Sequence, residues 1–120
     1  VPVRLYDPAP DQDTPVCLFF HGGGHLAGDV TVYDPICRRL AHASGWLVVS
    51  VEYRLAPEFP YPFGLEDCHS AARHIWPALD QTGRRYSRRL ALAGDSGGGT
   101  FAATISALAQ NDALLPVEKQ

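Results

Sequence analysis

Short apolar runs of strand length alternate with segments of helical character along this chain. The apolar runs lie at residues 2–6, 16–21, 46–52 and 88–94. A continuous apolar run such as "VCLFF" is typical of a strand buried on both faces. The segments of helical character lie at residues 33–45, 65–80 and 96–110. This alternation predicts an α/β fold with a mostly parallel sheet and helices on both faces.

The first predicted helix, 33–45, carries signals for both of its ends. Asp34 can serve as the N-cap, Pro35 suits the first turn, and Gly45 ends the helix. Three apolar residues fall on one side of this helix: Ile36, Leu40 and Ala43.

Composition excludes several classes of protein. With 120 residues, 46% hydrophobic and 19% charged, the chain is one globular domain or a piece of one. A net charge of −3 gives no reason to expect nucleic acid or an anionic membrane as partner. No run is long enough to span a membrane, and the chain does not open with the pattern of a signal peptide. Its first residue is Val, so the true start is allowed to be missing. Cys17, Cys37 and Cys68 lack metal-ligand spacing and are expected to be small core residues in a reducing cytoplasm.

The string "GDSGGGT", residues 94–100, places a serine between an apolar run and an Ala-rich one. Trypsin-like proteases carry a similar string between β-strands, whereas α/β-hydrolases carry Gly-x-Ser-x-Gly at the turn from a strand into a helix. The strand–turn–helix context here favours the second class. We therefore expect Ser96 to be a nucleophile in strained backbone, with Gly94 and Gly98 leaving room where strand and helix approach. An ordinary Gly-rich turn or a phosphate cradle is the alternative, but a Walker-type loop needs a Lys that is missing here.

The string "HGGGH", His21 to His25, follows an apolar strand. Successive glycines let backbone N–H groups turn toward a developing negative charge, as an oxyanion hole requires. A flexible linker and a His21–His25 metal pair are the alternatives. The metal pair is disfavoured, because this spacing brings both imidazoles together only in a helix and three glycines oppose one.

The loop "RLAPEFPYPFG", residues 54–64, is stiffened by three prolines. Arg54 and Glu58 are able to pair and pin it. We expect this loop to be a rigid connector and not a catalytic element.

Together and in this order, the three strings resemble those of the hormone-sensitive-lipase-like family of α/β-hydrolase esterases. That family carries His-Gly-Gly-Gly, then Tyr-Arg-Leu-Ala-Pro-Glu, then Gly-Asp-Ser-Ala-Gly-Gly. They read here as residues 21–24, 53–58 and 94–99, and the one departure is Gly97, where the family usually has Ala.

The resemblance implies an α/β-hydrolase fold and the hydrolysis of small, short-acyl carboxylic esters without metal or organic cofactor. It implies Ser96 as the nucleophile. Backbone N–H groups of Gly23, Gly24 and Gly97 would form the oxyanion hole, with His21 and Gly22 as structural members of their loop.

In α/β-hydrolases the catalytic acid and histidine follow the serine. No His follows Ser96, and Asp112 and Glu118 fall within or just past the next predicted helix. We therefore expect residues 1–120 to be the N-terminal half of a domain whose remainder supplies both groups and acts as partner. The alternative is an inactive relative that binds a small ligand.

The resemblance also implies a sheet order of first, third, second and fourth strand. The strand at 88–94 would then lie at the edge, covered by a strand after Gln120.

Overall fold

The computed structural model describes residues 1–110 and 117–119. Its strands are β1 (Val3–Tyr6), β2 (Thr14–Phe20), β3 (Leu47–Val51), β4 (Tyr86–Gly94) and β5 (Val117–Lys119). Its helices are α1 (Asp34–Ser44), α2 (Phe63–Arg73), α3 (Ile75–Thr82) and α4 (Gly97–Ala109). None of the helices in these described ranges has the length and apolar character needed to cross a membrane.

The five strands form one sheet in the order β1-β3-β2-β4-β5. Only β1 runs antiparallel to its neighbour, and the other pairs are parallel. The predicted order of the first four strands is confirmed. The prediction that the next strand begins after Gln120 is wrong, because β5 already pairs with β4 from Val117, opposite Leu90. The strand that follows α4 thus begins earlier in the sequence than predicted.

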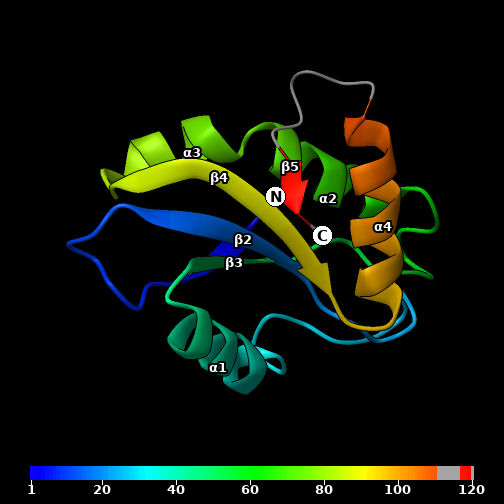
Figure 1. Cartoon of the computed structure of the whole chain (residues 1–120). Coiled ribbons are helices and arrows are strands. Elements are labelled where there is room, and N and C mark those ends of the chain that lie inside the picture. Colours follow the sequence, from blue (N-terminus) through cyan, green and yellow to red (C-terminus); the bar gives the residue numbers. More distant parts are fainter. Residues whose placement is uncertain (111–116, 120) are drawn as a thin grey trace.

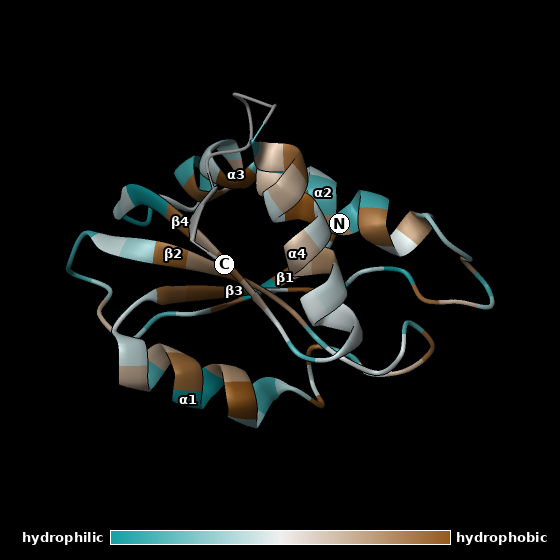
Figure 2. Cartoon of the chain, turned by 45° about the vertical axis from the view of Figure 1, so that its right-hand side comes forward, coloured by the Kyte–Doolittle hydropathy of each residue, from teal (hydrophilic) through white to brown (hydrophobic). Residues whose placement is uncertain are grey.

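Helices cover both faces of the sheet, α1 on one side and α2, α3 and α4 on the other (Figure 1). Alternate residues of the central strands face the two sides, and the middle of β2 and β3 is hydrophobic (Figure 2). On the side of α2–α4, the buried strand residues are Val16, Leu18, Phe20, Leu47, Val49, Val51, Leu90 and Leu92. On the side of α1 they are Tyr6, Cys17, Phe19 and Val48. All three cysteines are buried and free, as the sequence predicts.

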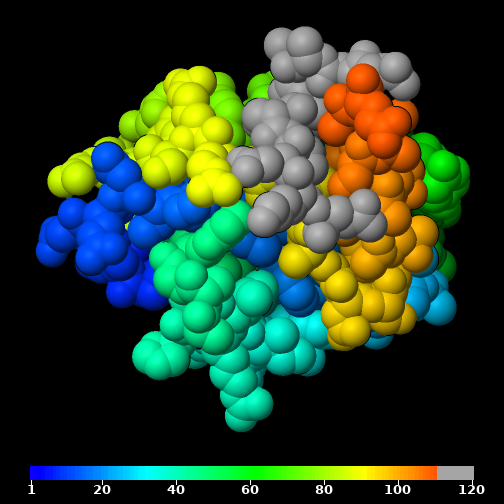
Figure 3. Space-filling model, viewed as in Figure 1, coloured from blue at the N-terminus to red at the C-terminus, as the bar shows by residue number. Residues whose placement is uncertain are grey.

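Helix α1 differs from its prediction at two points. It forms a ridge on the face shown in Figure 3 and buries Cys37 and Ala41, whereas Ile36 is 48% exposed. Small residues four apart let the helix approach the sheet closely, so they form the buried side. Asp34 does not cap the helix: it lies inside the first turn, where its carboxylate accepts hydrogen bonds from Arg38 and Tyr6.

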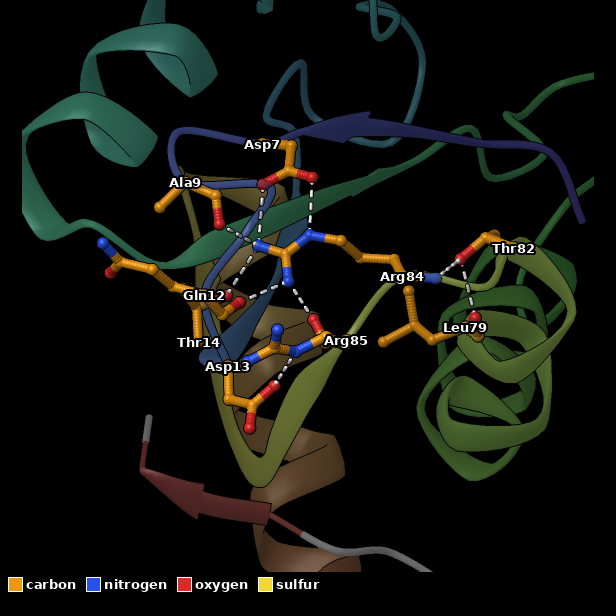
Figure 4. Close-up of polar contacts among 9 residues, drawn as sticks. All are labelled: Asp7, Ala9, Gln12, Asp13, Thr14, Leu79, Thr82, Arg84 and Arg85. Atoms are coloured by element: carbon orange, nitrogen blue, oxygen red, sulfur yellow. Dashed lines mark hydrogen bonds and ion pairs between the residues drawn. The ribbon is translucent and has the colours of Figure 1, made fainter.

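The amino end of β4 is fastened to the connection between β1 and β2 by Arg84 (Figure 4). The Arg84 side chain is 8% exposed, and its guanidinium pairs with the Asp7 carboxylate at 2.5 Å. It also donates to the carbonyl oxygens of Ala9 and Gln12 and to the Thr14 hydroxyl. The hydrogen bonds that Arg84 donates to the Asp7 carboxylate lower the pKa of Asp7. The cluster fixes the end of the sheet opposite to Gly94.

Candidate active site

Ser96 lies at the carboxyl end of β4, where the chain turns into α4. Its backbone has φ 54° and ψ −116°, a conformation that is strained for a residue with a side chain, and the residue is exposed. A Cβ on Gly98 would lie 1.8 Å from the Phe20 carbonyl oxygen, and one on Gly94 would lie 2.3 Å from that of Gly98. Glycine at both positions therefore allows the close approach of strand and helix that the sequence predicts.

The glycine loop after β2 begins beside this turn, because Phe20 at the end of β2 pairs with Gly94. Figure 3 shows the cyan segment after β2 against the yellow start of α4. Gly23 and Gly24 have φ of 131° and 65°. Among the described residues, the N–H groups of Gly23, Gly24 and Gly97 find no hydrogen-bond acceptor. Three backbone donors thus lie in the two segments that meet at this turn, the glycine loop and the start of α4.

Asp95, next to Ser96, is engaged elsewhere. Its Oδ2 accepts a hydrogen bond of 2.7 Å from the Tyr33 hydroxyl, which lies just before α1. This hydrogen bond raises the pKa of Tyr33. A Cβ on Gly22 would lie 2.6 Å from the Asp95 carbonyl oxygen, so the glycine loop and the serine turn touch here. No local sequence signal links Tyr33 with Asp95.

His21 is fully buried and belongs to the frame of the glycine loop. Its ring stacks on Tyr53 with centroids 4.3 Å apart, and the Tyr53 hydroxyl donates to the His21 carbonyl oxygen at 2.6 Å. Its Nδ1 lies 2.9 Å from the Gly22 carbonyl oxygen. Burial raises the pKa of Tyr53, so this hydroxyl stays protonated and keeps donating.

The proline-rich loop is pinned, but by a different carboxylate from the one expected. Arg54 pairs with Asp67 of α2 and not with Glu58, which is exposed. Asp67 accepts hydrogen bonds from the Arg54 backbone N–H, Nε and Nη2 at 2.9, 2.9 and 2.7 Å. Burial of Asp67 favours its neutral form, but these hydrogen bonds outweigh it, so the pKa of Asp67 lies below its usual range.

A sequence signal for Asp67 exists. Helical spacing places it on the same side of α2 as the buried residues Gly64, Cys68 and Ala72. A carboxylate on a buried side requires a cationic partner.

An apolar cavity of about 470 Å³ opens beside the glycine loop. It lies between that loop, the proline-rich loop and α4. Its walls include His25, Leu26, Phe59, Leu65 and Phe101. It can hold an apolar group of a ligand whose polar part reaches Gly24.

Among the described residues, the acid that follows Ser96 and the histidines outside the glycine loop are dispersed over the fold. Asp112 lies outside the described residues, and Glu118 belongs to β5. His42 lies on α1 and His69 on α2, while His74 lies between α2 and α3 with its Nδ1 2.9 Å from the Ser70 carbonyl oxygen.

The family model of the α/β-hydrolase fold matches residues 17–120. The chain belongs to this family. Among its relatives is esterase LipI of Mycobacterium tuberculosis, 47% identical over 111 residues that make up 90% of this chain and 34% of the relative. Carboxylesterase NlhH of the same species is 42% identical over 112 residues, covering 92% of this chain and 35% of the relative.

Solved structures of α/β-hydrolase esterases are similar to this chain. EstE1, a thermophilic carboxylesterase cloned from a metagenomic library, has a TM-score of 0.90 at 42% identity, covering 98% of this chain and 40% of its own. The esterase of the archaeon Pyrobaculum calidifontis has a TM-score of 0.88 at 39% identity, covering 98% and 37%. The resemblance to the hormone-sensitive-lipase-like esterases is confirmed. The chain spans about a third of the length of the curated relatives it matches.

Proposed function

We propose that this chain carries the nucleophile and the oxyanion hole of a carboxylic ester hydrolase. The observation that carries the proposal is the backbone of Ser96, held at φ 54° at the turn from β4 into α4. An ordinary turn from strand to helix would place glycine at a positive φ, so strain at a serine indicates a position kept for its hydroxyl. The esterase relatives support the same reaction class.

In the proposed reaction the Ser96 Oγ attacks the ester carbonyl carbon while a base accepts its proton. The carbonyl oxygen becomes an oxyanion, which the N–H groups of Gly23, Gly24 and Gly97 stabilise together with the amino end of α4. Collapse of the intermediate expels the alcohol, which takes up the proton, and leaves an acyl-enzyme on Ser96. Water activated by the same base then releases the acid.

The base and its orienting carboxylate are assigned to the remainder of the domain, which is the proposed partner of this chain. His21 and Gly22 shape the loop without taking part in the chemistry. Small, short-acyl esters are the proposed substrates, with the cavity beside Gly24 receiving their apolar group. The three buried, free thiols fit the proposed reducing cytoplasm.

The test is Ser96→Ala in the complete domain, assayed with p-nitrophenyl acetate. Loss of the nucleophile should lower kcat on the order of a million-fold and leave the circular dichroism spectrum unchanged. An organophosphate probe should label the unsubstituted protein at Ser96 and leave the Ala variant unlabelled. Retained hydrolysis in the Ala variant would assign the nucleophile elsewhere. A complete domain that neither hydrolyses esters nor takes up the probe would instead be a ligand-binding relative without catalysis.

A further inference from the structure

The His25 ring lies where a side chain on Gly97 would point. A Cβ built on Gly97 would lie 3.0 Å from His25 Cε1 and 3.2 Å from its Nδ1. The ring also packs against Phe101 of α4, with centroids 4.6 Å apart. The imidazole thus contacts α4 at two places, its first residue and an aromatic ring one turn further along.

Two local features of His25 are energetically unfavourable. Its backbone has φ 67°, in the left-handed region that side chains disfavour. Its Nδ1 is buried and finds no partner within the described part of the chain. Since neither feature favours folding, the contacts of the ring itself must account for its placement.

Those contacts connect the proposed oxyanion donors. Gly24 immediately precedes His25, and a Cβ on Gly97 would lie 3.0–3.4 Å from the ring and the backbone nitrogen of His25, so His25 links the two backbone segments that supply N–H groups. The His25 carbonyl oxygen accepts the Ala56 N–H at 2.9 Å, which fixes the backbone on the side of the proline-rich loop. Movement of the ring would therefore change the distance between the N–H groups of Gly24 and Gly97.

We propose that His25 is a positioning residue of the oxyanion hole and that its ring takes the place of the methyl group that related esterases carry at position 97. The inference rests on the proposed function. It explains the one departure from the family motif: Gly97 is glycine because the ring fills the adjacent space.

A double-substitution cycle in the complete domain tests this. Gly97→Ala alone should lower kcat for p-nitrophenyl acetate roughly tenfold with little change in KM, because a displacement of well under 1 Å costs less than the roughly hundred-fold of a 1 Å misplacement. His25→Asn removes the ring but tolerates the left-handed backbone, and it should lower kcat similarly. Adding Gly97→Ala to His25→Asn should cost nothing further, since the methyl group then has room.

His25→Phe is the matched control, since it keeps a ring and removes the unpartnered nitrogen. It should retain kcat within about threefold if ring volume alone positions the donors. Equal losses from Gly97→Ala in both backgrounds, or a Phe variant as slow as the Asn variant, would overturn the inference. Melting temperatures of the same variants should show the same coupling, which checks the packing independently of activity.

Organophosphate labelling separates the two possible failures. If the unsubstituted protein is not labelled at Ser96, the proposed function fails. If every variant is labelled at Ser96 but the losses in kcat are independent of one another, only the role of His25 fails.

Discussion

Gly23 and Gly24 occupy different environments although they are neighbours in one motif. A Cβ on Gly23 would lie 2.0 Å from the Ala27 carbonyl oxygen, whereas a Cβ on Gly24 would meet nothing within 4 Å. We expect Gly23→Ala to disrupt the loop and lower the melting temperature. Gly24→Ala should keep the loop but move its N–H group, and kcat should fall roughly a hundred-fold or more, as for loss of one oxyanion donor.

Gly83 supplies a matched control for Gly24→Ala. It has φ 73°, also has no atom within 4 Å of a built Cβ, and lies at the end of α3. Gly83→Ala should reduce stability by a similar amount through backbone strain and leave kcat unchanged. Near-normal kcat in both Gly23→Ala and Gly24→Ala would show that this loop is not the oxyanion hole.

At the scale of the elements, the Arg54–Asp67 pair joins the proline-rich loop to α2. Asp67→Asn should lower the free energy of unfolding by about 1–2 kcal/mol at neutral pH, because charged hydrogen bonds contribute about 1.5–3 kcal/mol and solvent screens Arg54. The Arg54 side chain is 41% exposed, so solvent weakens the pair and the expected loss of stability lies at the low end of that range. Urea unfolding of the complete domain measures the difference.

The contribution of the Arg54–Asp67 pair to stability should depend on pH in a defined direction. Because folding lowers the pKa of Asp67, its stabilisation is fully present above the unfolded value of about 3.9 and is lost as the pH falls through the folded value. The gap in stability between the unsubstituted protein and Asp67→Asn should therefore shrink below about pH 4. As a control, Asp13→Asn breaks the exposed Arg85–Asp13 pair and should leave the free energy of unfolding nearly unchanged. A gap that stays constant into acid would contradict the assignment.

At the scale of the whole molecule, the sheet leaves apolar surface uncovered at the β1 edge. On β1 and just before it, Val1, Val3 and Leu5 are 57%, 42% and 36% exposed. On the other side, the pairing of β5 with β4 reaches Ala91 within the described residues, and a hollow of about 330 Å³ lined by Leu92, Ala93 and Gly94 follows. Unpaired apolar edges of this kind promote association.

We expect residues 1–120 alone to self-associate and to hydrolyse no ester measurably. Co-expression with the remainder of the domain should give a soluble, active complex, because the remainder covers the edges and supplies the base. Analytical ultracentrifugation and p-nitrophenyl acetate hydrolysis measure both outcomes. A monomeric, cooperatively melting chain with esterase activity would defeat this expectation and would assign the base to an upstream histidine.

The sequence by itself determined strands β1 to β4, helices α1 and α4 and the turn at Ser96, whereas it predicted one helix over 65–80 where the structure has α2 and α3. Apolar runs and helical segments report burial through local periodicity, and glycines mark places where backbones approach or φ is positive. The order β1-β3-β2-β4 followed from family resemblance and agrees with right-handed crossovers. These features depend on residues close together in the chain or on a motif of fixed spacing.

Only the tertiary structure decided which side chains become partners. Arg54 meets Asp67 and not Glu58, Tyr33 meets Asp95 across 62 positions of sequence, and the His25 ring settles against Gly97. Each choice depends on how α1, α2 and α4 dock on the sheet, and many polar residues of suitable type are equally available in the sequence. Local pattern indicates most of the buried residues, with Ile36 of α1 an exception, whereas the partner of a side chain is fixed by the packing of elements that are far apart in the chain.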